Sequence, residues 1–490
     1  MSEVGCQNGD PRKNDIHVFQ KNGLYLGIHG SSMKVFELDA PSYSFLKFLE
    51  DGDAWEAAKT KLTVEYGETQ SAAVADGYGL LLNELHADLP VRPDLAENPK
   101  FTVKNLMFLV AEECNLACSY CFVNQGNYGQ GHKPPLMNRE TAVQAIDFFV
   151  DGGYLDTYCI LCFFGGEPLL NFDLVEKISE YAWEKLREKN KIRVGYSLTT
   201  NATLLTEQQI DYMLAKNFGI MISVDGPPEI HNRYRQTHGH EGTYDQVAAN
   251  TRRLIEKLKA TASKSYLVGR PTLTASEPDI HHLVQALEGL GFENIVSDPV
   301  SAPQGGESYT IGPDHVPAFA ASFQKLTEAM LDSILTRKSC SYSPIAWILN
   351  VMHNRIAKFE SCKAGVNFCT VDTLGDIYPC HRWVGFPERR IGNIWTGMDE
   401  SRLRDTAPLA VDERQPCSAC WARYFCGGGC YAESLQYMGS LHAVSDWRCA
   451  MFKSSLESYA WLYSMLQQKD PETLSYLADA QRPLNPAILE

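Results

Sequence analysis

Three cysteines within a short stretch form the motif of this sequence that is best suited to metal chemistry. Cys114, Cys118 and Cys121 follow directly after a predicted strand. Three thiolates on one short loop can ligate three irons of a four-iron four-sulfur cluster and leave the fourth iron without a protein ligand. Zinc is the simpler alternative, but a closed zinc site needs a fourth ligand, and none lies nearby in the sequence. The spacing therefore favours an iron–sulfur site with one open position.

A second group holds eight of the 15 cysteines and lies near the C-terminus: Cys362, Cys369, Cys380, Cys417, Cys420, Cys426, Cys430 and Cys449. Apolar periodicity is weak there, so a metal is expected to replace a hydrophobic core. Eight thiolates suffice for two zinc ions or for two four-iron clusters, and the spacing alone leaves both open. Of the other four, Cys159 and Cys162 lie in an apolar strand and are expected to be core residues.

Strands alternate with helices from Asn105 to about Val300. The predicted strands are Leu106–Ala111, Tyr158–Phe164, Val194–Thr199, Ile220–Val224, Tyr266–Leu273 and Asn294–Val300. The predicted helices are Arg139–Val150, Leu174–Lys189, Thr206–Lys216, Tyr244–Leu258 and Asp279–Leu290. This alternation predicts an α/β fold with a parallel sheet, open or curled into a partial barrel of six strand–helix units. Chemistry is then expected at the C-terminal ends of the strands.

The segments on either side of this sheet predict separate modules. A β-hairpin and a third strand (17–38), followed by three helices (43–86), predict a winged-helix-like N-terminal domain, with Asp88–Lys100 as a linker. The expected domains are residues 1–98 (N-terminal), 99–312 (partial barrel), 313–361 (linking helices), 362–466 (Cys-rich) and 467–490 (tail).

Further motifs stand at the ends of the second, third and fourth strands of the sheet. These are Gly165-Gly166-Glu167-Pro168, Thr199-Thr200-Asn201 and Ser223-Val224-Asp225-Gly226. The two glycines permit a close approach of backbones, and Glu167 supplies the anion that an ammonium group needs. Alone, the first motif would be an ordinary turn. The common position of the three motifs at one edge of the sheet indicates a ligand site.

The loop of Cys114, Cys118 and Cys121 resembles the signature of the radical S-adenosylmethionine (SAM) superfamily, and the resemblance extends from Asn105 to about Val300. It implies that the three cysteines hold a cluster that binds SAM. It also implies that the Gly-Gly-Glu motif holds the amino group of SAM, and that other strand-end residues contact its ribose, methionine and carboxylate portions. The cofactor-binding residues implied are Tyr120, Gly165, Gly166, Glu167, Thr200, Asn201, Ser223, Asp225 and Arg235.

The Cys-rich region resembles the SPASM domain that follows many radical SAM cores, and this resemblance implies two auxiliary four-iron clusters, hence three clusters in all. The second would take Cys417, Cys420, Cys426 and Cys449. The first would take Cys362, Cys380 and Cys430, with Cys369 as the expected fourth ligand. In some thioether-forming relatives the iron that this fourth cysteine would ligate stays open for the thiolate of the substrate. If Cys369 does not ligate, the substrate is expected to do so.

The closest resemblance is to thioether-forming peptide maturases, namely the SCIFF maturases and the maturase of the quinohemoprotein amine dehydrogenase small subunit. It rests on the loop Cys114–Phe122, on Gly126–Gly129, on Phe163–Phe172 and on Gly375–His381. The N-terminal region resembles the recognition element for precursors of ribosomal peptides (RiPPs), which binds a leader peptide by adding a strand to its sheet. A stabilising cap is the alternative reading of that region.

These resemblances imply an oxidoreductase that uses a 5′-deoxyadenosyl radical to join a Cys sulfur to a carbon within a ribosomal precursor peptide or small protein subunit. A ferredoxin or flavodoxin would supply electrons. Three alternatives remain open: a carbon–carbon cross-linking maturase, a formylglycine-forming sulfatase maturase, and a non-enzymatic zinc- or peptide-binding protein. No general base is assigned, and His381 is expected at most to donate to a cluster sulfur.

The charge balance limits the partners. The chain has 60 acidic and 44 Lys or Arg residues, a net charge of −16. This charge argues against nucleic acid and anionic membranes as partners and suits a basic leader peptide. No apolar run approaches the roughly 20 residues that span a bilayer, and Met1–Asp10 lacks the pattern of a signal peptide. We therefore expect a cytoplasmic protein, in which cysteines bind metal and do not form disulfides.

Overall fold

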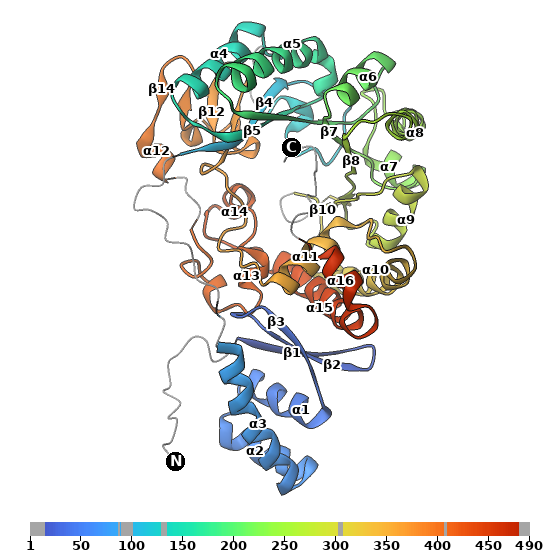
Figure 1. The fold of residues 1–490 in the computed structure, drawn as a ribbon, viewed down its shortest axis with the longest axis vertical. Coiled ribbons are helices and arrows are strands. Elements are labelled where there is room, and N and C mark those ends of the chain that lie inside the picture. Colours follow the sequence, from blue (N-terminus) through green and yellow to red (C-terminus); the bar gives the residue numbers. More distant parts are fainter. Residues whose placement is uncertain are drawn as a thin grey trace.

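The structure is a computed structural model that describes residues 15–86, 89, 101–128, 135–301, 307–405 and 409–479. Cys6, Gly129, the predicted linker Asp88–Lys100 apart from Leu89, and residues 480–490 of the predicted tail lie outside the described residues. Figure 1 shows the large sheet and its helices at one end, the N-terminal domain at the other, and the C-terminal helices between them.

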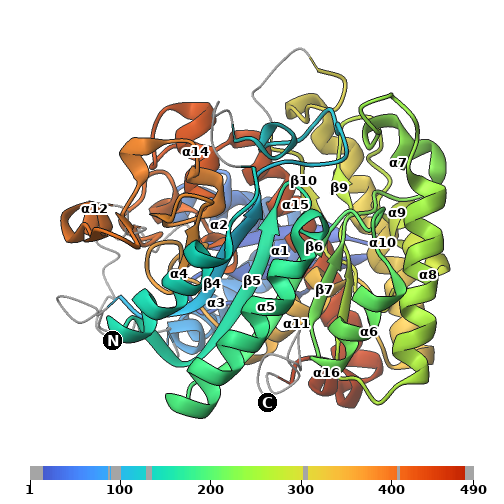
Figure 2. The same ribbon diagram turned by 90° about the horizontal axis from the view of Figure 1, so that it is seen from above.

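The large sheet has nine strands in the order β14-β13-β12-β11-β4-β5-β6-β7-β8, of which β4 to β8 run parallel. These five are β4 (Val103–Ala111), β5 (Leu155–Gly165), β6 (Arg193–Thr200), β7 (Gly219–Ile222) and β8 (Tyr266–Gly269). The connecting helices are α4 (Arg139–Asp151), α5 (Phe172–Ala182), α6 (Glu207–Ala215), α7 (Pro228–Tyr234), α8 (Tyr244–Ala260) and α9 (Ile280–Leu290). Figure 2 shows α5, α6 and α8 outside the strands. The predicted α/β partial barrel is confirmed.

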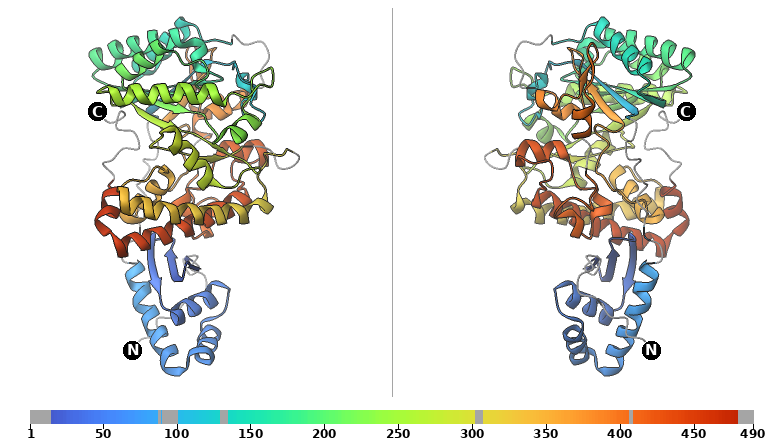
Figure 3. Two further views of the ribbon diagram at one scale, coloured as in Figure 1. Left: turned by 90° about the vertical axis from the view of Figure 1, so that its right-hand side faces the viewer. Right: turned by 90° about the vertical axis from the view of Figure 1, so that its left-hand side faces the viewer.

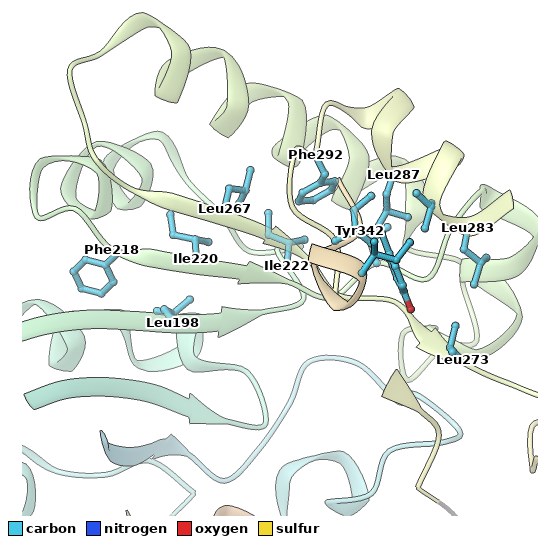
Figure 4. Packing of buried hydrophobic residues seen from close by; sticks show 14 of the residues in the cluster. Leu198, Phe218, Ile220, Ile222, Leu267, Leu273, Leu283, Leu287, Phe292 and Tyr342 are labelled. Atoms are coloured by element: carbon cyan, nitrogen blue, oxygen red, sulfur yellow. The ribbon is translucent and has the colours of Figure 1, made fainter. Parts of the chain in front are cut away.

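The sixth predicted strand of the barrel is shorter than expected. β10 (Asp298–Pro299) pairs in parallel with β9 (Thr272–Leu273) in a separate two-stranded sheet, and a single bridge joins Gly269 to Ile295. Figure 4 shows the apolar side chains of β7, β8 and α9 packing together at this end of the barrel. The barrel is therefore open on this side, toward the C-terminal region.

The other edge of the parallel strands carries an addition that the sequence did not predict. β11 (Phe368–Val371) pairs in parallel with β4, with Cys369 opposite Leu106. β12 (Asp376–Tyr378), β13 (Gly392–Asn393) and β14 (Gly397–Met398) then extend the sheet in antiparallel fashion. The Cys-rich region thus begins as part of the barrel sheet.

The remaining elements of the C-terminal part are helical. They are α10 (Val316–Arg337), α11 (Ser343–Asn354), α12 (Glu400–Asp405), α13 (Arg423–Cys426), α14 (Tyr431–Met438), α15 (Asp446–Lys469) and α16 (Pro471–Leu477). α15 packs against both α10 and α11. Because α16 adds Leu474 to the shared core, part of the predicted tail is an ordered element.

The N-terminal domain contains the predicted hairpin, third strand and three helices. They are β1 (Ile16–Lys21), β2 (Leu24–His29), β3 (Lys34–Leu38), α1 (Ala40–Glu50), α2 (Trp55–Tyr66) and α3 (Glu68–His86). Asn22 and Gly23 both have positive φ, as a tight hairpin turn requires. Leu26 and Ile28 belong to the same apolar cluster as α15, and Figure 3 shows the three strands against the C-terminal helices.

Candidate active site

The three cysteines of the first motif lie in the loop after β4, at the C-terminal edge of the sheet. The Sγ of Cys114 accepts a hydrogen bond from the N–H of Leu116 at 3.4 Å, and the Sγ of Cys121 accepts one from Gln125 at 3.3 Å. Burial raises the pKa of Cys114 to about 12 and that of Cys118 to about 11. The Cys114 thiol also interacts with the charges of Cys118 and Cys121, so the structure brings the three together.

The glycines after β5 allow the backbone to approach this loop closely. A Cβ on Gly165 would collide with the carbonyl oxygen of Ala111, and one on Gly166 would collide with that of Glu113. Instead, the N–H of Gly166 donates to Ala111 at 2.7 Å, and the N–H of Glu167 donates to Glu113 at 2.9 Å. The Gly-Gly-Glu motif therefore fixes the loop that leads into Cys114.

Glu167 joins the ends of β5 and β6. It is fully buried and accepts hydrogen bonds from the Thr200 hydroxyl at 2.7 Å, from the N–H of Asn201 at 2.8 Å and from the N–H of Leu169 at 3.0 Å. Burial raises the pKa of Glu167 to about 7, although these hydrogen bonds oppose the shift. A carboxylate has about four acceptor positions, so one remains for a cation such as an ammonium group.

Asn201 extends this network to the cysteine loop. Its Nδ2 donates to Asn115 at 3.0 Å and lies 3.8 Å from the Sγ of Cys114, while its Oδ1 accepts from Thr203. The Oγ1 of Thr203 in turn accepts from Asn115 at 2.8 Å. Sequence reasoning missed Asn115 and Thr203, although each stands within two residues of a predicted site residue.

A second polar cluster stands at the end of β7. Arg235 donates two hydrogen bonds to Asp225, at 2.9 and 3.1 Å, and the Tyr120 hydroxyl donates to the same carboxylate. Both members of the ion pair are buried, and the Arg235 guanidinium lies 5.4 Å from the Tyr120 ring centre. Ser223 joins the end of β7 to the end of β6, since its N–H donates to the carbonyl of Thr200. The pairing of Asp225 with Arg235 was not predicted, and their contacts with SAM stay predictions.

Tyr234 and Tyr309 surround Tyr120 and were not predicted. Their ring centres lie 5.8 and 6.3 Å from that of Tyr120, and 5.8 Å from each other. The N–H of Ser119 donates to the carbonyl of Tyr234, which secures the cysteine loop. Tyr234 lies in the stretch that contains Arg235 and could have been found there, whereas nothing in the sequence marks Tyr309.

Seven of the eight C-terminal cysteines form two groups in the structure. Electrostatic interactions connect the thiols of Cys362, Cys380 and Cys430 with one another. The same holds for a second group of Cys417, Cys420, Cys426 and Cys449. Burial raises the pKa of Cys380 to about 12 and that of Cys449 to about 11. These groups coincide with the two ligand sets that the resemblance implied.

Cys369 lies apart from both groups, contrary to the sequence-based expectation. It is fully buried in β11, in the apolar cluster that also contains Leu106 and Cys159, and the thiols that it interacts with are Cys159 and Cys162. Successive side chains of a strand point to opposite faces, so its pairing with Leu106 places Cys369 on the helix-covered face. We therefore correct the prediction and leave Cys369 out of the ligand set.

A buried layer lies between the cysteine loop and the first C-terminal group, on the other face of the sheet. It contains Tyr128 and Trp383 and is in contact with Cys121 and Cys430. Tyr128 interacts electrostatically with Glu112, Cys121 and Cys380, and its hydroxyl has no hydrogen-bond partner among the described residues. The indole Nε1 of Trp383 is likewise buried without a partner among the described residues, so this mostly apolar layer contains two unpaired polar atoms.

His381 belongs to the same region but is packed among rings. Its ring centre lies 4.9 Å from that of Phe164 and 5.7 Å from that of Phe122. Burial and the neighbouring Arg382 lower the pKa of His381 to about 3, so the imidazole is neutral near pH 7. No residue of the site is assigned as a general base.

The C-terminal region closes over the open side of the barrel through contacts with the end of β10. Arg382 donates to the Ser301 hydroxyl at 2.7 Å, and Tyr437 donates to the Ser301 carbonyl at 3.2 Å. Arg448 donates to the carbonyls of Pro299 and Val300. These hydrogen bonds attach the Cys-rich region to the last strand of the barrel.

The residues fit iron–sulfur clusters in several respects. A cavity of about 840 Å³ is lined by Cys417, Cys420, Cys426, Cys430 and Cys449, among other residues. Backbone N–H groups donate to the sulfurs of Cys114, Cys121 and Cys380. Among the described residues, no three Cys, His, Asp or Glu side chains converge closely enough to hold a single metal ion.

Comparison with known proteins identifies the class. Residues 109–284 match the Radical SAM superfamily. The chain is 25% identical over 330 residues to the cysteine-type anaerobic sulfatase-maturating enzyme of Clostridium perfringens strain 13, covering 65% of this chain and 85% of that enzyme. It is 28% identical over 294 residues to an uncharacterized protein of Methanocaldococcus jannaschii, covering 60% of this chain and 89% of that protein.

A solved structure shows the same fold. It is that of native anSMEcpe with bound AdoMet, with a TM-score of 0.63 at 21% identity, over 74% of this chain and 99% of that one. Residues 109–284 thus form a Radical SAM domain, the chain is a radical SAM enzyme, and it is similar to anaerobic sulfatase-maturating enzymes. The match to this superfamily implies a four-iron four-sulfur cluster and SAM. No helix among the described residues is long and apolar enough to cross a membrane.

Proposed function

We propose that this enzyme joins a cysteine sulfur to a carbon within a ribosomally made precursor peptide. The observation that carries the proposal is the position of Cys369. Because Cys369 is buried in the apolar core and is not grouped with Cys362, Cys380 and Cys430, a cluster on those three thiols would have one iron without a protein ligand, open to a substrate thiolate. Such a site binds the sulfur that will form the thioether.

The proposed enzyme holds three four-iron clusters and SAM, with electrons supplied by a ferredoxin or flavodoxin. The first cluster lies on Cys114, Cys118 and Cys121, and the auxiliary clusters lie on the two C-terminal groups. Bound together, the radical cluster and SAM supply a 5′-deoxyadenosyl radical, and the auxiliary clusters supply an acceptor for one electron per link.

The described side chains have clear roles in this scheme. Glu167 has an acceptor position for the SAM ammonium group. Thr200 and Asn201 hold the carboxylate of Glu167 in place. Asp225, Arg235 and Tyr120 form a rigid floor beside the cysteine loop. The layer of Tyr128 and Trp383 excludes water between the site of radical formation and the open iron.

The N-terminal domain is the proposed binding site of the leader peptide. β3 is an edge strand of its three-stranded sheet, to which a peptide strand can be added. The Nζ of Lys34 in β3 contacts Glu84 in α3, and Leu80, 73% exposed, lies one turn earlier on that helix. Leu80 is thus placed to contact a peptide beside β3.

Substituting this exposed side chain tests peptide binding without disturbing the fold. We expect Leu80→Asp to weaken binding of a labelled precursor at least about tenfold in fluorescence anisotropy, because a charge replaces an apolar contact of roughly 1.4 kcal/mol or more. The matched control is Val64→Asp, which changes a residue of α2 that is 85% exposed. Equal binding by the two variants would show that the leader binds elsewhere.

Mass spectrometry tests the reaction itself. A Cys-rich precursor peptide is incubated anaerobically with reconstituted enzyme, SAM and dithionite, then reduced and treated with iodoacetamide. We expect each link to remove two hydrogens and to protect one sulfur from alkylation. A product that has lost two hydrogens but whose cysteines all alkylate would indicate carbon–carbon cross-linking.

Maturation of a sulfatase is the second candidate, and the sequence similarity to sulfatase-maturating enzymes over 65% of the chain favours it. That reaction would convert a Cys or Ser of a sulfatase peptide to formylglycine. The same assay with a sulfatase-derived peptide separates the two, because an aldehyde product reacts with a hydrazine probe and a thioether does not.

A further inference from the structure

Lys358 lines the same cavity as Cys426 and Cys449 of the second C-terminal thiol group and Cys430 of the first. It stands four residues before Cys362, in the segment after α11, and its backbone N–H donates to the carbonyl of Tyr424 at 2.8 Å. The hydroxyl of Ser361 donates to the carbonyl of Gly429, in the turn that joins Cys426 of the second group to Cys430 of the first. A Cβ on Gly427 would come within 2.7 Å of the backbone of Glu360. The segment that carries Lys358 is therefore pressed against the loop that carries Cys426.

The Lys358 ammonium interacts with one thiol of each group. These are Cys426 of the second group and Cys362 of the first. Its Nζ lies 3.7 Å from the centre of the Trp347 ring, and burial lowers its pKa. Among the described residues, no carboxylate forms an ion pair with it. A partly buried cation is costly without a counter-charge, and one aromatic ring compensates for only part of that cost.

Lys363 provides a contrast a few residues away. It directly follows Cys362, but its side chain is 48% exposed and its ammonium pairs with Glu360 at 2.7 Å. The charge of Lys363 is thus already balanced by a carboxylate and screened by water. The two lysines therefore differ in burial and in counter-charge.

We propose that Lys358 is the counter-charge shared by the two auxiliary clusters and that it raises their reduction potentials. The inference rests on the auxiliary clusters of the proposed function. One-electron reduction adds one negative charge to a cluster, and a nearby desolvated cation stabilises that charge. Lys358 would thereby make the auxiliary clusters better acceptors for the electron that closure of the sulfur–carbon bond releases.

Redox titration followed by electron paramagnetic resonance tests this role. The protein is the full chain with Cys114, Cys118 and Cys121 changed to Ala, so that only auxiliary clusters give signals, and dithionite is the reductant. We expect Lys358→Met, which keeps the packing on Trp347, to lower the ratio of reduced to oxidised cluster at a fixed potential about tenfold. For one electron this equals a midpoint shift of about 59 mV to more negative values.

Two controls separate charge from structure. Lys358→Arg keeps the cation and should retain the parent midpoints. Lys363→Met removes a half-exposed charge that pairs with Glu360 and also acts on Cys362, so its midpoint shift should be smaller than that of Lys358→Met. Equal midpoints in Lys358→Met and Lys363→Met, with about eight irons in each, would overturn the proposal and leave the clusters in place. Loss of iron in Lys358→Met alone would make the residue structural and also overturn it. A parent protein without auxiliary iron would remove the proposed function as well.

Discussion

The two thiol-bearing regions of this enzyme are built in different ways. The loop of Cys114, Cys118 and Cys121 stands at the edge of a parallel sheet and is fixed by side chains that bind one another, as Glu167 binds Thr200 and Asn201. The Cys-rich region is built from short elements joined by loops. Its loops are gathered around Arg414, which is 1% exposed.

Arg414 shows what replaces a core in that region. Its guanidinium donates to the carbonyls of His442, Gly428 and Ala443 and to the Ser434 hydroxyl. It also stacks over the Tyr431 ring at 4.7 Å. The barrel site is therefore expected to keep its shape without a cluster, whereas the C-terminal region depends on its thiols and their metal. The predictions below test that difference.

The largest expected effect concerns the radical cluster. Changing Cys114, Cys118 and Cys121 to Ala should abolish 5′-deoxyadenosine formation under dithionite, because no other thiol stands at that edge of the sheet in the described residues. Chromatography of the products measures it. The protein should remain folded, as judged by circular dichroism. Cys340→Ala is the control, and 5′-deoxyadenosine from the triple variant would disprove the assignment.

Loss of one auxiliary ligand should unfold part of the chain. We expect Cys426→Ala to lose about four of roughly 12 irons and to become sensitive to trypsin within residues 409–449, because metal replaces a core there. Iron analysis and mapping of the cleavage sites measure both effects. A variant that loses the iron but resists protease would show that Arg414 alone organises the region.

Breaking the ion pair between Arg235 and Asp225 should have a smaller effect on the protein than the loss of a cluster. Arg235→Met leaves the Asp225 carboxylate buried without its partner and should lower the free energy of unfolding by about 3–5 kcal/mol. Urea denaturation of the barrel measures it. The double variant with Asp225→Asn should recover part of the loss. No recovery would mean that Arg235 acts through packing alone.

The smallest effect concerns how the N-terminal domain is docked. Burial alone would lower the pKa of His17, but its hydrogen bonds to Glu457 and Glu50, at 3.0 and 2.6 Å, raise it above 6.5. Its ring also stacks on Trp421 at 4.1 Å. A raised histidine pKa stabilises the fold fully below the unfolded pKa and loses this effect as the pH rises through the folded pKa.

His17→Gln should therefore lower stability by about 1 kcal/mol at pH 6, and the difference should shrink toward pH 9. Thermal unfolding across this range measures it. Asn22→Gln, in the exposed hairpin turn, serves as a control whose effect should not depend on pH. A difference for His17→Gln that is constant with pH would show that stacking on Trp421, and not charge, secures the domain.

Local patterns were sufficient to predict most of the fold and of the barrel site. The alternation of strands and helices, the Asn22-Gly23 turn and the strand-end motifs are all features of short range. Arg414 was not predicted, since a lone Arg in a Cys-rich segment carries no pattern. The pairing of Asp225 with Arg235 was also missed, because each was assigned to the cofactor separately.

The position of Cys369 required the tertiary structure. The run Phe368–Val371 is too short to identify as a strand, and its partner β4 lies more than 250 residues earlier in the chain. Without that pairing, Cys369 is one more thiol among ligands. With it, the period of two along the strand places the residue in the apolar core. Long-range parallel pairing therefore decides how many ligands the first auxiliary cluster has.

The iron content and activity of Cys369 variants test the open ligand position most directly. Cys369→Ala and Cys369→Val should each retain about 12 irons and should form thioether links in a precursor peptide like the parent, whereas Cys380→Ala should lose about four irons and form none. Loss of iron and of cross-linking in both Cys369 variants, to the level of Cys380→Ala, would contradict an open iron and place Cys369 among the ligands.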